Sequence, residues 1–117
     1  MPSIRELIAA IRQRDGVQAA IVLGRDGLLI DSLVAPDMDA DDLAARIPAI
    51  ITAADDLGRA NNHGELLTGI LEHQSGLTLV SVLSPEAILF VMVESRANVG
   101  QLLFELRRNR EHIAALV

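Results

Sequence analysis

The hydrophobic pattern of the chain centres on residues 87–93, where seven apolar residues follow one another. A strand with one exposed face would alternate apolar and polar residues, whereas an unbroken run of this length indicates a strand covered on both faces. The upstream run Leu77–Leu83 alternates more clearly, and Ser84–Glu86 between the two, with a proline at its centre, is typical of a turn. We therefore expect a hairpin in a sheet that has helices on both faces.

The N-terminal residues predict a helix. Ser3 and Glu6 have the spacing of a capping box, and apolar residues follow at the spacing of one helical face. We expect this helix over Ile4–Arg14, and Gly16 can end it in the left-handed conformation.

Three more strands are predicted from the pattern. Two of them, at 17–23 and 28–33, are separated by Gly-Arg-Asp-Gly at 24–27, which contains the Asp-Gly pair that favours a tight hairpin turn. Residues 65–72 predict the other, and a Gln-Ser-Gly turn connects it to the strand at 77–83.

A helical stripe of apolar residues over Leu43–Leu57 predicts a middle helix. Aspartates at 39–42 precede the stripe and place negative charge where the N-terminus of a helix is stabilised by it. Pro48 lies inside the stripe and removes one backbone hydrogen bond. We therefore expect either a kink near 44–48 or a helix that begins there.

The C-terminal residues predict one last helix. Asn98 suits its N-cap, with Gln101 at the third helical position, and apolar residues from Val99 to Leu116 lie on one face. The predicted order of elements is α-β-β-α-β-β-β-α. This order belongs to the mixed α/β (α+β) class, and we expect residues 1–117 to form a single domain.

Composition and charge narrow the possible functions. Half of the 117 residues are hydrophobic but only two are aromatic, so aliphatic side chains must build the core. The net charge is −6 and all ten basic residues are arginine, which argues against nucleic acid and anionic membranes as partners. Without lysine or cysteine there is no Schiff-base chemistry, disulfide or thiolate metal site. Because neither a signal-peptide pattern nor an apolar run of about 18 residues is present, we expect a cytoplasmic protein.

The acidic segment at 37–41 imitates the start of a calcium-binding EF-hand loop. The glycine that such a loop needs at its sixth position is Asp42, and the glutamate at its twelfth is Pro48, so an acidic helix start explains the segment better. The histidines have no paired spacing, and we expect solvated or locally bonded side chains rather than metal ligands at His63, His73 and His112.

The sequence contains no catalytic or cofactor motif. The glycines at 24–27 precede a strand rather than a helix, so a hairpin turn explains them better than a phosphate cradle. Ser75, Ser81 and Ser84 lack the Gly-x-Ser-x-Gly context and obvious histidine and carboxylate partners. We therefore expect no cofactor and no active site of the chain's own.

Some arginines could reach the active site of a GTPase in trans, because an arginine finger accelerates hydrolysis by several orders of magnitude. The competing interpretation is an exposed or ion-paired arginine, which is the more common situation for any single residue. The candidates are Arg25, Arg46, Arg59 and Arg96.

A resemblance to a known family is carried by Gly16–Asp31 (GVQAAIVLGRDGLLID), by Glu94–Arg108 (ESRANVGQLLFELRR) and by the order of elements. With these features the chain resembles the Roadblock and dynein light-chain family, and within it the bacterial MglB-type proteins most. The resemblance implies five antiparallel strands, with the first and last helices on one face and the middle helix on the other. It also implies that two subunits join through the third strand and the middle helix into one continuous sheet.

The function that the resemblance implies is regulatory. MglB-type dimers bind a Ras-like GTPase of the MglA type and accelerate GTP hydrolysis without donating a catalytic arginine, while other members are scaffolds or motor light chains. We expect a homodimer that binds such a GTPase and holds its switch segments; the alternative is a dimerisation scaffold or light-chain-like adaptor. A small-ligand sensor is disfavoured because aromatic residues are scarce. The sequence stops at Val117, at the end of the last predicted helix, which argues against a function that needs the C-terminal extension of some MglB proteins.

The residues themselves also favour a dimer. The apolar strand at 66–71 would lie at a sheet edge in the implied order, and such an edge needs a partner or protection. A second copy of the middle helix would complete the cover of the sheet, and a glycine at 69 would allow close approach. We expect the interface with a second copy or with the GTPase to use Leu43, Arg46, Ile47, Ile50, Ile51, Ala54, Leu67, Gly69 and Leu71.

Overall fold

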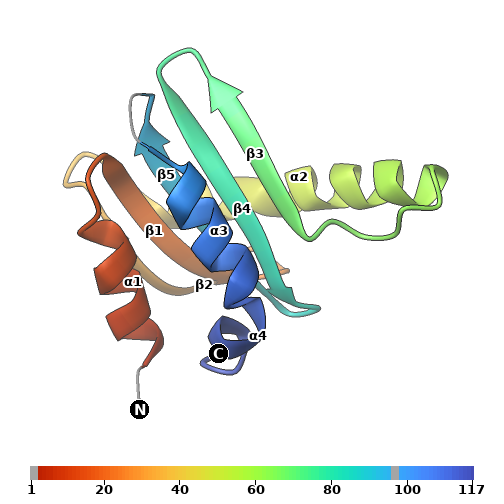
Figure 1. Ribbon diagram of the computed structural model, residues 1–117, viewed down its shortest axis with the longest axis horizontal. Coiled ribbons are helices and arrows are strands. Elements are labelled where there is room, and N and C mark those ends of the chain that lie inside the picture. The colour runs from red at the N-terminus through yellow and green to blue at the C-terminus, as the bar shows by residue number, and fades with distance from the viewer. Residues whose placement is uncertain (1–2, 96–97) are drawn as a thin grey trace.

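The fold is one antiparallel sheet with helices on both faces, as seen in the computed structural model, which describes residues 3–95 and 98–117 (Figure 1). The strands lie in the order β2-β1-β5-β4-β3, and every neighbouring pair is antiparallel. The predicted five-stranded antiparallel sheet and the mixed α/β class are confirmed. The strands are β1 (Val17–Gly24), β2 (Leu29–Val34), β3 (Thr68–His73), β4 (Gly76–Ser84) and β5 (Ala87–Glu94).

The helices of the described residues cover the sheet from both sides. They are α1 (Ile4–Arg12), α2 (Ala40–Ala60), α3 (Gly100–Arg108) and α4 (Arg110–Ala114). Helices α1, α3 and α4 lie on one face of the sheet and α2 lies on the other (Figure 1). The predicted placement of the first, middle and last helices is therefore confirmed. None of these described helices is both long and apolar enough to span a membrane.

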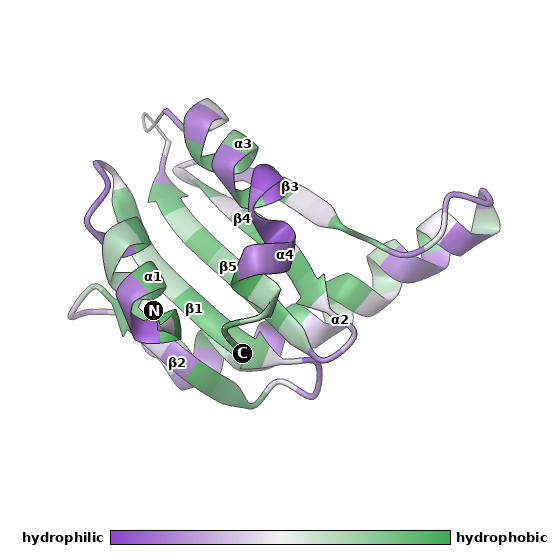
Figure 2. Ribbon diagram, turned by 60° about the horizontal axis from the view of Figure 1, so that its bottom comes forward, coloured by the Kyte–Doolittle hydropathy of each residue, from purple (hydrophilic) through white to green (hydrophobic). Residues whose placement is uncertain are grey.

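The apolar run at 87–93 lies in the central strand β5, between β1 and β4. Leu89 and Val91 belong to the core beneath α1, α3 and α4, whereas Ile88 and Phe90 belong to the core beneath α2. All four side chains are buried, and Figure 2 shows the apolar band that runs along β1, β5 and β4. A strand covered on both faces explains why the run does not alternate.

Local hydrogen bonds form the first helix and the first hairpin in the predicted places, although α1 ends at Arg12 and not at the predicted Arg14. Ser3 Oγ accepts a hydrogen bond from Glu6 N at 3.2 Å, so Ser3 is the N-cap of α1. The turn between β1 and β2 closes through Gly24 N, which donates to Leu28 O at 2.8 Å. Gly27 in this turn has a φ of 89°, which glycine adopts without strain.

Helix α2 runs through Pro48, so the predicted alternative of a helix that begins near Pro48 is wrong. Asp39 is the N-cap, and its carboxylate accepts a hydrogen bond from Asp42 N at 3.2 Å. Packing outweighs the backbone hydrogen bond that the proline removes, because Ala44 and Ile51 on either side of it are buried against the sheet.

The C-terminal helix, predicted as one piece, is divided at Asn109 into α3 and α4. The backbone N–H and the Nδ2 group of Asn109 both donate to Glu105 O, at 3.0 and 2.9 Å. This side chain competes with the helical hydrogen-bond pattern, which explains the break. The start also differs: Val99 is the N-cap of α3, while Asn98 Oδ1 accepts a hydrogen bond from Gly100 N at 3.2 Å.

We expect Ser3→Ala to lower the free energy of unfolding by about 1 kcal/mol, because Glu6 N loses the oxygen that caps it. Urea unfolding followed by circular dichroism measures this difference. Ser75→Ala is the control, since Ser75 is an exposed serine in the turn between β3 and β4. If both variants unfold at the same urea concentration as the parent chain, the cap contributes nothing to stability.

Candidate protein interface

Exposed apolar side chains gather around α2 and β3. Among the described residues, eight large hydrophobic side chains are exposed, and four of them lie on α2, on β3 or just before β3. We call these four residues, together with strand β3, the α2–β3 surface. Helix α2 extends past β3 beyond the edge of the sheet (Figure 1). The four exposed fractions are 36% for Ile50, 66% for Leu57, 59% for Leu67 and 46% for Ile70.

The two edges of the sheet differ in what lies against them. Strand β2 forms one edge, and Arg5 of α1 reaches it. Arg5 Nη2 lies 2.9 Å from Asp31 Oδ1, and its Nη1 donates to Ser32 O at 3.3 Å. Strand β3 forms the other edge, so its outer side offers backbone groups for pairing with another strand.

The predicted interface residues have three different environments. Ile47 and Ile51 are 4% and 2% exposed and pack against the sheet, so their side chains lie in the chain's own core and are unavailable to a partner. Arg46, Ile50 and Leu67 are exposed. Partly buried positions are occupied by Leu43, Ala54, Gly69 and Leu71.

Leu57 and Ile70 belong to the α2–β3 surface as well, and the predicted interface does not include them. Leu57 lies two helical turns after Ile50, so both side chains project from the same face of α2. The buried residues of α2 occupy the neighbouring face of the helix. Treating the buried stripe and the Ile50–Leu57 stripe as two separate patterns in the sequence could have identified Leu57 as an interface residue.

An open cavity of about 590 Å³ lies beside this surface. Leu57, Leu66 and Leu67 contribute apolar side chains to its lining, and Arg110 of α4 also lines it. Arg110 Nη2 donates to Leu67 O at 3.2 Å and also contacts Thr68 Oγ1. The start of β3 is therefore attached to the last helix.

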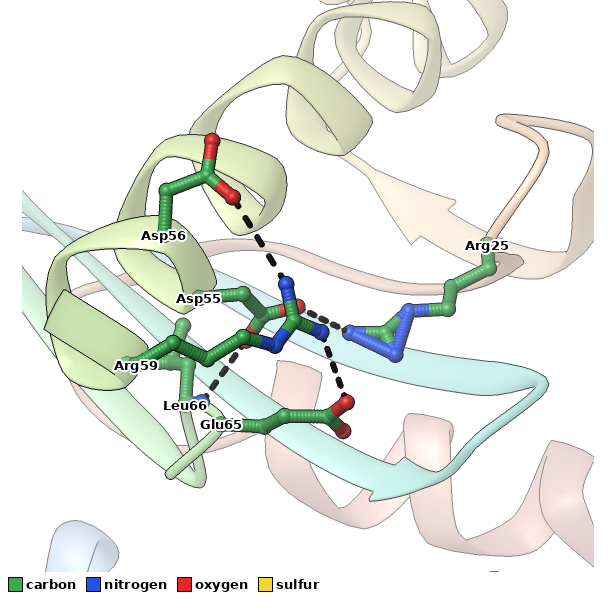
Figure 3. Close-up of polar contacts among 6 residues, drawn as sticks. All are labelled: Arg25, Asp55, Asp56, Arg59, Glu65 and Leu66. Carbon is green, nitrogen blue, oxygen red and sulfur yellow. Dashed lines mark hydrogen bonds and ion pairs between the residues drawn. The ribbon is translucent and has the colours of Figure 1, made fainter. Parts of the chain in front are cut away.

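Asp55 joins three segments of the chain at this surface (Figure 3). The residue is 5% exposed, and its Oδ2 accepts a hydrogen bond from Arg25 Nη2 at 2.8 Å. Its Oδ1 accepts a hydrogen bond from Leu66 N at 2.7 Å. This contact explains why β3 begins at Thr68 and not at the predicted Glu65, because the Leu66 amide is bonded to α2 rather than to a strand.

Arg59 forms an exposed set of contacts next to Asp55 (Figure 3). Its Nη2 donates to Glu65 Oε1 at 2.8 Å, and its Nη1 lies 3.6 Å from Asp56 Oδ1. The hydrogen bond to Glu65 raises the pKa of Arg59 above its ordinary value. Exposed ion pairs of this kind contribute little to stability, so Asp55 is the stronger of the two attachments.

The described arginines that could serve as GTPase fingers are paired with carboxylates of this chain. Arg25 and Arg59 hold the partners given above. Arg46 Nε donates to Asp42 Oδ2 at 3.1 Å, and this hydrogen bond raises the pKa of Arg46. The fourth candidate, Arg96, lies outside the described residues. The three described arginines therefore fit the ion-paired interpretation.

The other candidate side chains have local surroundings. His73 Nε2 lies 3.1 Å from Thr78 Oγ1, and Ser84 Oγ accepts a hydrogen bond from Ala87 N at 3.1 Å. Ser81 Oγ is buried and has no hydrogen-bond partner within the described chain. In the part of the chain that the structure describes, no three metal-ligating side chains come together. Exposed positions are occupied by His63, Ser75 and His112.

Residues 4–93 match the sequence model of the Roadblock/LC7 domain. The chain belongs to the Roadblock/LC7 domain family. Two relatives from Methanocaldococcus jannaschii, the uncharacterized proteins MJ1340 and MJ0310, are 28% and 27% identical to it over 113 residues. Each match covers 97% of this chain and 98% of the relative. Family membership supports a regulatory or adaptor role.

Solved structures of Roadblock/LC7 proteins share this fold. Myxococcus xanthus MglB superposes with a TM-score of 0.86 at 14% identity, over 97% of this chain and 93% of that one. A Roadblock/LC7 domain from Streptomyces avermitilis superposes with a TM-score of 0.84 at 20% identity, over 97% of both chains. The overlap extends past the matched residues 4–93, so α3 and α4 belong to the shared fold.

Gly58 allows the segment after α2 to fold back onto the helix. A Cβ atom at Gly58 would clash with Gly64 O, and His63 N donates to Gly58 O at 2.7 Å. We expect Gly58→Ala to lower the free energy of unfolding by roughly 1–2 kcal/mol, because backbone at Gly64 must move. In an unobstructed helix the same change would stabilise the chain by about 1 kcal/mol, so the sign of the effect is informative.

The matched control for this prediction is Gly100→Ala in α3, where an added Cβ would lie 3.6 Å from Asn98 Oδ1. Urea unfolding of the two variants and the parent chain measures the difference. A Gly58→Ala variant as stable as the parent, or more stable, would mean that the close approach to Gly64 does not restrict this position.

Proposed function

We propose that this Roadblock/LC7 protein forms a homodimer through the α2–β3 surface and that the dimer binds a Ras-like GTPase of the MglA type. In this proposal the dimer promotes GTP hydrolysis by holding the switch segments of the GTPase in a productive arrangement. The observation that carries the proposal is the apolar, partly uncovered edge formed by β3 and α2.

The homodimer is supported by the shape of this edge. Two copies related by a two-fold axis would pair their β3 strands antiparallel and continue the sheet across both chains. The same axis would bring the outer faces of the two α2 helices together, where Ile50 and Leu57 are 36% and 66% exposed. Fully burying an exposed leucine or isoleucine side chain contributes about 1.5–3 kcal/mol, and these two side chains, already partly covered, would each contribute a fraction of that.

The GTPase step is supported by the family and by the arginines. Members of this family act as regulators or adaptors, and the fold is shared with MglB. Arg25, Arg46 and Arg59 each hold a carboxylate of their own chain. Because these three arginines are occupied in this way, we expect the protein to act on hydrolysis by positioning the residues of the GTPase itself and not by donating one of the three.

The deciding experiment mixes the purified protein with a Ras-like GTPase of the MglA type from the same organism and measures GTP turnover. We expect faster turnover that saturates with increasing protein. Binding without acceleration would leave a scaffold or adaptor role, and no binding at all would contradict the GTPase part of the proposal.

We expect Ile50→Arg to raise the dissociation constant of the dimer at least tenfold, which corresponds to about 1.4 kcal/mol. The reason is that a charged side chain would be placed between the two α2 helices without a partner. Sedimentation equilibrium measures the constant. Phe104→Arg is the control, because Phe104 is 60% exposed on α3 at the opposite face of the sheet. If both variants dimerise with the same dissociation constant as the parent protein, the interface lies elsewhere.

A further inference from the structure

Asp55 occupies a place in the buried stripe of α2 where an apolar residue would be expected. The buried residues of α2 are Ala44, Ile47, Ile51 and Asp55, at the spacing of one helical face. The first three pack in the core beneath α2, whereas Asp55 contacts Leu66, which lies just before the edge strand β3. A carboxylate in such a position destabilises a fold unless its oxygens are bonded, so its contacts indicate its role.

The contacts of Asp55 hold the beginning of the edge strand. Oδ1 takes the Leu66 amide at 2.7 Å, and the next residue, Leu67, accepts a hydrogen bond from Val82 N at 2.9 Å. Strand pairing with β4 therefore begins directly after the contact with Asp55. Figure 3 shows this contact. The other oxygen takes Arg25 Nη2 at 2.8 Å, which supplies the opposite charge that the buried carboxylate needs.

The two ends of β3 are fixed in different ways. At its C-terminal end, His73 pairs with Gly76 across a short turn, and this turn sets the register with β4. At its N-terminal end the chain arrives from residues 61–67, which belong to no helix or strand. There the bond between Asp55 and Leu66, beside the contact of Arg110 with Leu67 O, takes the place of a tight turn.

We propose that Asp55, held by Arg25, is a positioning residue that places the start of β3 for pairing with a second copy of this chain. The inference rests on the homodimer proposed above. In a two-fold antiparallel pair the start of one β3 strand lies opposite the end of the other. If the start of β3 moves away from α2 in each chain, both ends of the shared strand pair are therefore disturbed. The exposed Leu67, directly before β3, is displaced as well.

The neighbouring carboxylates provide matched controls. Asp56 follows Asp55 in the same helix but is exposed, and its contact with Arg59 is 3.6 Å long. Glu65 binds Arg59 from the segment before β3 and is also exposed. Removing either of them removes one exposed ion pair and leaves the Leu66 amide bonded to Asp55.

The test compares the dimer dissociation constant and the hydrogen exchange rate of the Leu66 amide in single variants. We expect Asp55→Ala to raise the dissociation constant at least tenfold and to speed exchange at Leu66 at least tenfold. Asp56→Ala should change both quantities less than twofold. Asp55→Asn keeps an oxygen for the Leu66 amide, so its exchange rate should stay closer to that of the parent chain.

Two further variants separate positioning from a general loss of stability. Leu102→Ala removes a buried side chain from the core on the other face of the sheet, so it should lower the unfolding midpoint and leave the dissociation constant within twofold. Arg25→Gln leaves Asp55 buried without its cation. It should weaken the dimer more in the parent chain than in the Asp55→Asn background, where no charge remains to be paired.

The outcomes are distinguishable. A monomeric parent chain at millimolar concentration would overturn the homodimer and this inference with it. A dimeric parent whose Asp55→Ala variant is folded and dimerises within twofold of the parent would overturn the inference alone. If Asp55→Ala does not fold, the effect of Arg25→Gln on the dissociation constant decides. An equal effect in the parent chain and in the Asp55→Asn background would overturn the inference.

Discussion

The burial of β5 on both faces is the constraint on which the rest of the structure depends. Leu89 and Phe90 are neighbours in the chain, yet each is buried, in cores on opposite sides of the sheet. One face is covered by α1, α3 and α4, and the other face is covered by α2. Helix α2 continues beyond β3, so its outer end has no sheet beneath it (Figure 1). Leu57, three residues before the end of α2, remains 66% exposed.

Helix α2 is attached to the rest of the chain in two chemically different ways. Its first part is held by apolar packing through residues such as Ile47 and Ile51. Near its end the attachment becomes polar, through the carboxylate of Asp55 and the close approach of Gly58 to Gly64. Apolar burial stabilises without fixing direction, whereas hydrogen bonds fix the position of particular atoms. The hydrogen bonds of Asp55 thus fix the position of the end of α2 relative to the free edge of the sheet.

The features that could be predicted from sequence are those with local causes. The cap at Ser3, the turn at Gly27 and the doubly covered strand at 87–93 follow from neighbouring residues. The remaining features depend on contacts between distant residues. Pro48 stays inside a helix because the sheet holds the turns on either side, and β3 starts late because the Leu66 amide meets Asp55.

The candidate interface also combines features with local causes and features that depend on contacts between distant residues. An apolar helical stripe indicates that α2 packs against something, but only the assembled sheet separates the face of Ile47 from that of Ile50. The sequence also contains Arg25 and Asp55 without any pattern that joins them, since they meet only after β1, β2 and α2 have packed. Family likeness supplies the arrangement of helices and strands, and side-chain contacts have to be read from the folded chain.

The break at Asn109 has a consequence for the order in which the molecule is completed. It turns the chain so that Arg110 meets the carbonyl of Leu67, a residue 43 positions earlier. A ribosome delivers residues from the N-terminus onwards, so the hairpin of β3 and β4 emerges long before this arginine. During synthesis the free edge therefore passes through an interval in which one of its restraints, the bond from Arg110, does not yet exist.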